Sequence, residues 1–210
     1  LYERAGNVRT NDGQVGSLTM IGTVSPAGGN FEEPVTQATL NTVKTFLGLS
    51  ADRAYKRFYP AVDPLLSWSR YREQLAPWYQ QHLGKDWSAT VQAVVALLEK
   101  GDAVFRMMQV TGEEGVSLSD FVLYQKALLV DMVYLQQDAY DDVDVSTPLA
   151  RQKEVFGLLY LVTQQETIFL DKQSARQFYT KLTLLFKDMN YSDQDSDTYR
   201  RYREKIQSEL

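Results

Sequence analysis

The sequence of 210 residues contains no cysteine and one histidine, His82. The lack of cysteine excludes a disulfide framework and thiolate metal sites, and a single histidine excludes most histidine zinc sites and catalytic triads. No apolar run approaches the roughly 20 residues of a membrane-spanning helix, and no secretory signal is recognisable. We therefore expect a cytoplasmic protein that does not insert into a membrane.

Positive charge is also scarce, because 22 Lys and Arg stand against 27 Asp and Glu, which gives a net charge of −5. Binding to phosphate backbones requires a basic surface, so nucleic acid is not expected as a partner. The aspartate-rich stretch over residues 138–144 lacks the glycine and the glutamate of a calcium-binding EF-hand loop. No metal site is therefore expected within this sequence.

The first third of the chain combines a strand-like pattern with helices. The chain begins without an initiator methionine, and a strand is expected over residues 17–24. An isolated strand needs neighbours, so we expect the chain to start inside a domain. A loop with proline and glycine follows over residues 25–30, and helices are expected over residues 34–48 and 51–58. These features predict the end of an α/β domain in residues 1–70.

Residues 71–210 show the apolar spacing that is typical of amphipathic helices. Thr147 is expected to cap a helix that has Pro148 at its first position. The expected helices cover residues 71–83, 88–100, 102–110, 118–137, 148–169, 171–189 and 198–210. Amphipathic helices with short connections form bundles. The predicted fold is therefore mixed but mainly α, with the tail of an α/β domain followed by a C-terminal helical bundle.

Residues 59–69 carry the most informative motif, Tyr-Pro-Ala-Val-Asp-Pro-Leu-Leu-Ser-Trp-Ser. It resembles the signature of nucleotide-binding subunits of rotary ATPases, in which a proline loop places an aromatic ring against adenine. The signature positions here are Pro60, Asp63, Ser67 and Ser69. The resemblance indicates that the α/β tail belongs to a nucleotide-binding domain.

Three further segments support a narrower resemblance. Residues 2–6 read Tyr-Glu-Arg-Ala-Gly, residues 24–36 read Val-Ser-Pro-Ala-Gly-Gly-Asn-Phe-Glu-Glu-Pro-Val-Thr, and residues 134–140 read Tyr-Leu-Gln-Gln-Asp-Ala-Tyr. With the motif above, they are similar to the C-terminal third of the catalytic A subunits of V-type ATP synthases. The sequence departs from that family at Asn30, where aspartate is usual, and at Tyr59 and Tyr140, where phenylalanine is frequent.

The resemblance implies an adenine pocket made by Tyr59, Pro60, Gln137 and Tyr140. ATP or ADP with Mg²⁺ would bind to the complete subunit. The phosphate-binding motif G-x-x-x-x-G-K-[ST] does not occur, since the single Gly-Lys pair, Gly84-Lys85, precedes an aspartate. No catalytic residue is therefore assigned, and this chain alone is expected to bind no cofactor and to hydrolyse no ATP. There is a simpler alternative to each pocket role. Tyr59 packs on a neighbouring helix, and Tyr140 is an ordinary aromatic residue at a helix end.

The resemblance also implies two contacts with a central rotor shaft. One is the glycine loop with Pro26, Gly28, Gly29 and Asn30, and the other is the acidic loop with Glu113, Glu114 and Asp120. A plain turn and a solvated acidic loop are the alternatives.

The implied function is ATP synthesis or hydrolysis coupled to proton or sodium transport. The implied partners are B subunits in an alternating hexameric ring and the shaft, with the whole head peripheral to the membrane. A non-catalytic homologous subunit, or a free-standing helical adaptor without nucleotide binding, remains an alternative.

Overall fold

Helices make up most of the computed structural model, which describes residues 2–210. Up to residue 70 the elements are short: η1 (Tyr2–Arg4), β1 (Gly6–Arg9), β2 (Val15–Leu18), η2 (Ala27–Gly29), α1 (Pro34–Thr42), β3 (Thr45–Phe46), α2 (Ala51–Tyr55) and β4 (Trp68–Ser69). Longer helices follow: α3 (Arg72–His82), α4 (Trp87–Thr111), η3 (Glu113–Gly115), α5 (Leu118–Val130), the π-helical turn η4 (Asp131–Leu135), α6 (Leu149–Gln164), α7 (Lys172–Asn190) and α8 (Asp197–Ser208). The predicted mainly α fold is confirmed.

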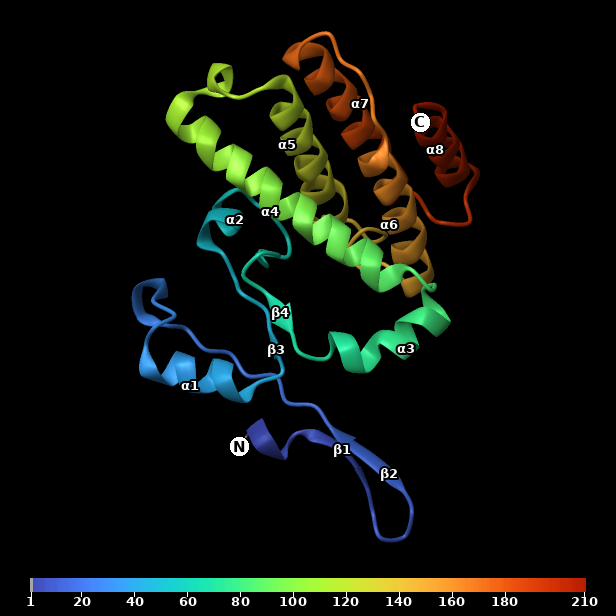
Figure 1. Ribbon diagram of the computed structural model, residues 1–210. Coiled ribbons are helices and arrows are strands. Elements are labelled where there is room, and N and C mark those ends of the chain that lie inside the picture. The colour runs from blue at the N-terminus through green and yellow to red at the C-terminus, as the bar shows by residue number, and fades with distance from the viewer. Residues whose placement is uncertain (1) are drawn as a thin grey trace.

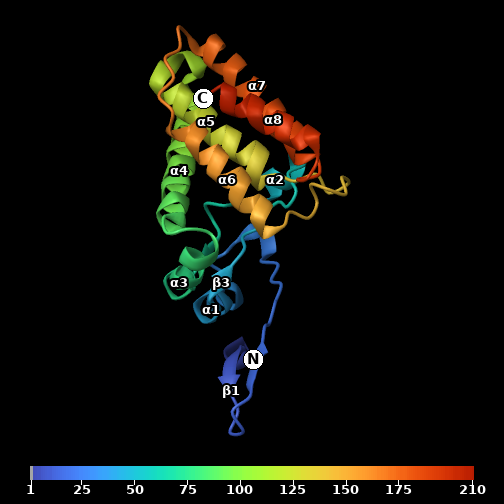
Figure 2. The same ribbon diagram turned by 90° about the vertical axis from the view of Figure 1, so that its right-hand side faces the viewer.

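The long helices α4 to α8 and the first hairpin lie at opposite ends of the molecule. Figure 1 shows α4 to α8 together in a bundle that includes the C-terminus, whereas β1 and β2 extend away from it near the N-terminus. Figure 2, turned by 90°, shows the same separation. The elements α1 and β3 lie between the hairpin and the bundle in both views, and Figure 1 shows β4 beside β3.

The hairpin corrects the strand that was predicted over residues 17–24. Strand β2 pairs antiparallel with β1 in a register that runs from Gly6 opposite Leu18 to Arg9 opposite Val15. Residues 19–24 pair with no strand in residues 2–210 and have no regular structure. A strand needs a hydrogen-bonded neighbour, so the predicted strand was wrong after its first residues.

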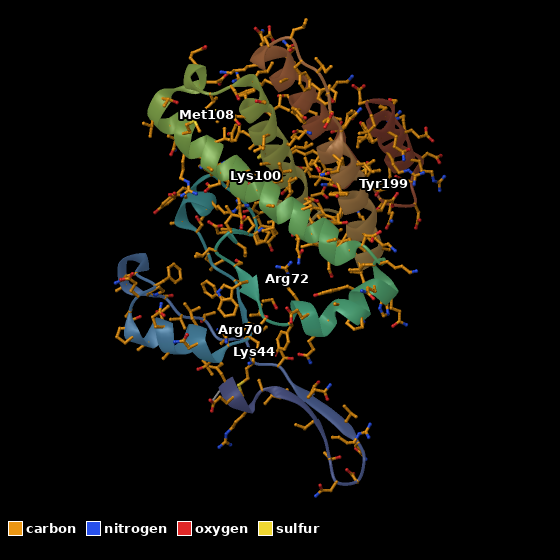
Figure 3. The ribbon with its side chains drawn as sticks, in the orientation of Figure 1. Lys44, Arg70, Arg72, Lys100, Met108 and Tyr199 are labelled. Atoms are coloured by element: carbon orange, nitrogen blue, oxygen red, sulfur yellow. The ribbon has the colours of Figure 1, made fainter. Side chains whose placement is uncertain are left out.

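A second small sheet corrects the helix predicted over residues 34–48. Helix α1 ends at Thr42, and Val43 is extended with φ −73° and ψ 155°. The chain then enters β3, which pairs antiparallel with β4. The Arg70 N–H donates to the Lys44 carbonyl at 2.7 Å next to this pair, and Figure 3 labels both residues. Pairing with β4 therefore replaces the last turns of the predicted helix.

Helix α4 is continuous, although two helices were predicted with a break at Gly101. A Cβ at Gly101 would collide with the side chain of Ala127 on α5. The glycine thus marks a close approach of two helices and not a helix end. The ends of the next two helices differ from the prediction. The π-turn η4 follows α5 and ends at Leu135. Helix α6 begins at Leu149 after an extended Pro148, so Thr147 is not its cap. Helix α6 also stops at Gln164, before the predicted residue 169.

The main core lies in the bundle. Its fully buried side chains come from α5, η4, α6, α7 and α8 and include Phe121, Leu129, Leu159, Leu182, Phe186 and Ile206. Tyr199 on α8, labelled in Figure 3, is also buried, with the Arg151 guanidinium 5.4 Å from its ring centre. Within residues 2–210 no helix has both the length and the apolarity needed to cross a membrane. The domain division at residue 70 stays a prediction.

Candidate functional site

The loop that carries Tyr59 is fixed to the segment before α2. Val62 forms an isolated antiparallel bridge with Leu49, and the Asp63 N–H donates to the Gly48 carbonyl at 2.8 Å. Gly48 is buried, and a Cβ there would collide with the side chain of Leu66. Glycine at position 48 therefore lets the loop over residues 60–69 lie directly on this segment.

The signature side chains hold the same loop together. The Asp63 carboxylate accepts the N–H groups of Leu65 and Leu66 at 2.9 and 3.2 Å. The Ser67 hydroxyl donates to the Asp63 carbonyl at 2.6 Å and accepts the Gly48 N–H at 3.0 Å. The Ser69 and Thr45 hydroxyl oxygens lie 3.0 Å apart, which joins β4 to β3. In this chain Asp63, Ser67 and Ser69 thus make the structure that presents Tyr59.

A cavity of about 260 Å³ lies beside Tyr59. Tyr59, Gln137 and Tyr140 all line it, whereas the fourth residue predicted for the pocket, Pro60, does not. Tyr59 is 46% exposed and Tyr140 is 98% exposed, so both rings are accessible to a ligand. Cavities that hold whole drug-sized ligands are commonly about 300–1,000 Å³. This cavity therefore suits a part of a ligand, such as one flat ring system.

The other walls of the cavity come from residues that sequence reasoning missed: Arg57, Met132, Gln136, Asp138, Ala139, Asp144, Lys187, Asn190 and Tyr191. Lys187, Asn190 and Tyr191 lie at the end of α7, far along the chain from Tyr59. No local pattern marks them, because only the packing of α7 brings them to the cavity. Arg57 has a positive φ of 61°, which its sequence context does not reveal.

Hydrogen bonds fix the inner side of the cavity. Asp144 accepts the Asp138 N–H at 2.6 Å, and the Gln137 side chain donates to the Asp144 carbonyl at 2.9 Å. Burial raises the pKa of the Asp144 carboxyl, and the bond from Asp138 and the charge of Arg151 partly oppose this rise. Burial likewise raises the pKa of Tyr191, whose hydroxyl donates to Asp138 at 3.4 Å. The residues 136–144 therefore form a supported wall and not a free loop.

The acidic loop is partly engaged within the chain. Glu113 forms an ion pair with Arg176 of α7, and its carbonyl accepts a hydrogen bond from Lys172 at 2.5 Å. The Asp120 carboxylate accepts the Ser117 hydroxyl at 2.7 Å at the start of α5. Glu114 makes no ion pair with any residue in the range 2–210. Of the predicted acidic contacts, Glu114 is thus the one left open to a partner.

The glycine loop forms the 3-10 turn η2. Pro26 precedes the turn, and Gly28 and Gly29 have positive φ angles of 63° and 71°. The Asn30 side chain accepts the Glu32 N–H at 3.0 Å, so it orders the approach to α1. All four predicted residues lie on an exposed turn or at its edge.

Two family models match the sequence. Residues 1–69 match the ATP synthase alpha/beta family, nucleotide-binding domain, and residues 76–179 match the C-terminal domain of V and A type ATP synthase.

Similar relatives include V-type ATP synthase alpha chains. The one from Treponema denticola is 45% identical over 209 residues, covering 100% of this chain and 34% of the relative. The one from Chlamydia pneumoniae is 44% identical, covering 98% and 34%, and the one from Borrelia duttonii is 48% identical, covering 90% and 31%. The chain thus spans about a third of the length of these relatives.

A solved structure is similar in fold. It is described as the structure of a unique ATP synthase subunit NeqB from Nanoarcheaum equitans. The TM-score is 0.61 at 22% sequence identity, and the match covers 79% of this chain and 38% of that chain.

Proposed function

Because this chain belongs to the family of V-type ATP synthase alpha chains, we propose that it works as part of a catalytic subunit that couples ATP synthesis or hydrolysis to proton or sodium transport. Its own contribution is the wall of an adenine pocket together with two rotor-facing loops. The phosphate-binding motif is not in its sequence. The chain therefore positions a nucleotide base and does not itself break the phosphate bond.

The shared cavity carries this proposal. Tyr59 comes from the loop before β4, and Tyr140 comes from the connection between η4 and α6, yet both border one cavity. An aromatic face that stacks on a base gains about 1–3 kcal/mol without reading the identity of the base strongly. Gln137 adds an amide at the same cavity, although its NH₂ group already donates to Asp144. The ligand that fits is the adenine ring of ATP or ADP.

Magnesium would bind to the phosphates of such a ligand, and the phosphate-binding motif is not in this sequence. No group of three or more His, Asp or Glu side chains that could hold a metal ion occurs within residues 2–210. We therefore assign no step of this chain to Mg²⁺.

The rotor contacts of the proposal rest on the glycine loop and on Glu114. The proposed partners are B subunits in an alternating ring and a central shaft, with the assembly peripheral to the membrane on its cytoplasmic side. A single exposed ion pair from Glu114 would contribute about 0–1 kcal/mol, so the shaft contact would depend on several such residues.

The test is the KM for ATP of the ATPase assembled with the complete gene product that contains these residues. Tyr59→Ala removes one face of the base pocket, and we expect the KM to rise about tenfold. Tyr59→Phe keeps that face and should leave the KM unchanged. Tyr55→Ala is the matched control, because Tyr55 is 84% exposed on α2 and does not line the cavity. Equal KM values for the Tyr59→Ala and Tyr55→Ala proteins would contradict the pocket and favour a Tyr59 ring that only packs on a helix.

A further inference from the structure

The two sides of the cavity are joined by an ion pair between α2 and the π-turn. The Arg53 guanidinium donates two hydrogen bonds to the Asp131 carboxylate, at 3.0 and 2.7 Å. The side chains are 13% and 22% exposed, so the pair is largely removed from water. In Figures 1 and 2, α2 is the element of residues 2–70 that lies against the bundle. This pair is thus a direct link between the early part of the chain and the helical part.

The same two residues are also linked through the backbone at the cavity. The Phe58 N–H donates to the Arg53 carbonyl at 3.0 Å, and the Gln136 N–H donates to the Asp131 carbonyl at 3.0 Å. The next residue on each side completes the connection, because the Gln137 N–H donates to the Tyr59 carbonyl at 2.6 Å. These bonds and the ion pair form a closed, hydrogen-bonded ring of six residues: Arg53, Phe58, Tyr59, Asp131, Gln136 and Gln137.

Two further observations indicate that the ring is a specific structure. The Arg53 guanidinium lies 4.4 Å from the centre of the Phe58 ring, so the arginine also holds the residue before Tyr59. Asp131 opens the π-turn η4, and such turns are rare and often occur at functional sites. The turn brings the Gln136 N–H to the Asp131 carbonyl, which aims the following residue at Tyr59.

We propose that Arg53 and Asp131 are positioning residues for the nucleotide base: they hold Tyr59 at a fixed place relative to Gln137 and Tyr140. This inference rests on the adenine pocket proposed above. Neither residue lines the cavity, so each acts through the ring and not by contact with a ligand. The ring consists of residues of this chain alone, so its bonds fix Tyr59 relative to Gln137. Preorganisation of this kind reduces the ordering that binding would otherwise require.

The two hydrogen bonds of the pair depend on the shape of the Arg53 guanidinium as well as on its charge. An arginine and a carboxylate can form two parallel hydrogen bonds, whereas a lysine offers one compact charge. Arg53→Lys should therefore weaken the ring although it keeps the charge. Replacing either partner removes the same connection, so the effects of Arg53→Met and Asp131→Asn should not add.

The experiment measures the KM for ATP and kcat in the ATPase assembled with the complete gene product. We expect Arg53→Met and Asp131→Asn each to raise the KM about fivefold to tenfold, since the aromatic face is displaced but present. The double variant should raise it no further, and kcat should stay within about twofold of the original value. The control is Arg203→Met, which breaks an arginine–carboxylate pair that does not line the cavity, with Glu154, between α8 and α6. Its KM should be unchanged.

Hydrogen exchange at the Gln137 amide gives a second, ligand-free measurement. Breaking the ion pair should raise the exchange rate of this amide, and Arg203→Met should not. If Arg53→Met prevents assembly, Arg53→Lys gives the same comparison with a smaller change.

The outcomes separate this inference from the pocket itself. A raised KM for Tyr59→Ala together with unchanged KM values for both pair variants would overturn the positioning role and leave the pocket intact. A lowered kcat with an unchanged KM would also overturn it. An unchanged KM for Tyr59→Ala would overturn the pocket and the positioning role together, and faster Gln137 exchange would then show that the ring is purely structural.

Discussion

Within residues 2–70 two residues are buried, Thr36 and Gly48. Every buried apolar side chain of the described chain lies in residues 71–210. The early region is held by turn hydrogen bonds, such as those of Asp63 and Ser67, and by pairs of very short strands. The bundle is held by apolar packing among α5 to α8. The comparison shows that a cavity wall can be shaped by local hydrogen bonds when it is attached to a well-packed neighbour.

The ion pair between Arg53 and Asp131 is where the two regions meet. On one side of it the chain has few buried contacts, and on the other side Asp131 follows a helix with several buried residues. The stability of the Tyr59 loop therefore depends on the bundle more than on its own contacts. Substitutions of the same kind should consequently have unequal effects in the two regions.

The largest expected contrast is between two leucines. Leu182 on α7 is 1% exposed in the core, and Leu47 before α2 is 64% exposed. Leu182→Ala leaves a cavity and should lower the free energy of unfolding by about 2–5 kcal/mol. Leu47→Ala removes no buried contact and should change it by about 0.5 kcal/mol or less. Urea unfolding followed by circular dichroism measures both values, and similar losses would show that the early region has a core of its own.

A smaller contrast comes from glycine. Gly101→Ala would place a methyl group against Ala127 and should lower the free energy of unfolding by about 1–3 kcal/mol. Gly157→Ala on α6 meets open space and should raise it by about 0.5–1 kcal/mol, because alanine favours the helix. Gly28→Ala strains a turn with positive φ but contacts no core residue, so the unfolding of the bundle should not change. Thermal unfolding of the three variants tests this order, and a stable Gly101→Ala protein would contradict the close helix approach.

The sequence predicted the bundle well because apolar spacing is a local property. It predicted the strand over residues 17–24 poorly, since strand length depends on a partner, and the partner strand begins at Gly6, opposite Leu18. Gly101 was misread for a related reason, because a helix contact across the bundle is invisible in a local pattern. The resemblance pointed to Tyr59, Gln137 and Tyr140, which share a cavity, and their role stays a prediction. The contribution of α7 to that cavity arises from packing, and no spacing in the sequence announces it.

The smallest expected effect concerns the buried carboxylate of Asp144, which lies in residues 71–210. Asp144 is 8% exposed, and its burial raises the pKa of the carboxyl above the ordinary value of 3.8. The folded chain therefore holds this proton more tightly than the unfolded chain, and the free energy of unfolding should fall as the pH rises above about 4. Asp144→Asn cannot ionise, and its side-chain oxygen can still accept the Asp138 N–H. Relative to the original chain, this variant should gain stability as the pH rises from 4 to 7, as measured by urea unfolding at several pH values.

Asp144→Ala is the control, because it loses the hydrogen bond and should be less stable by about 1–3 kcal/mol at neutral pH. A relative stability of Asp144→Asn that falls over the same pH range would mean that the buried carboxylate stabilises the wall as a charge.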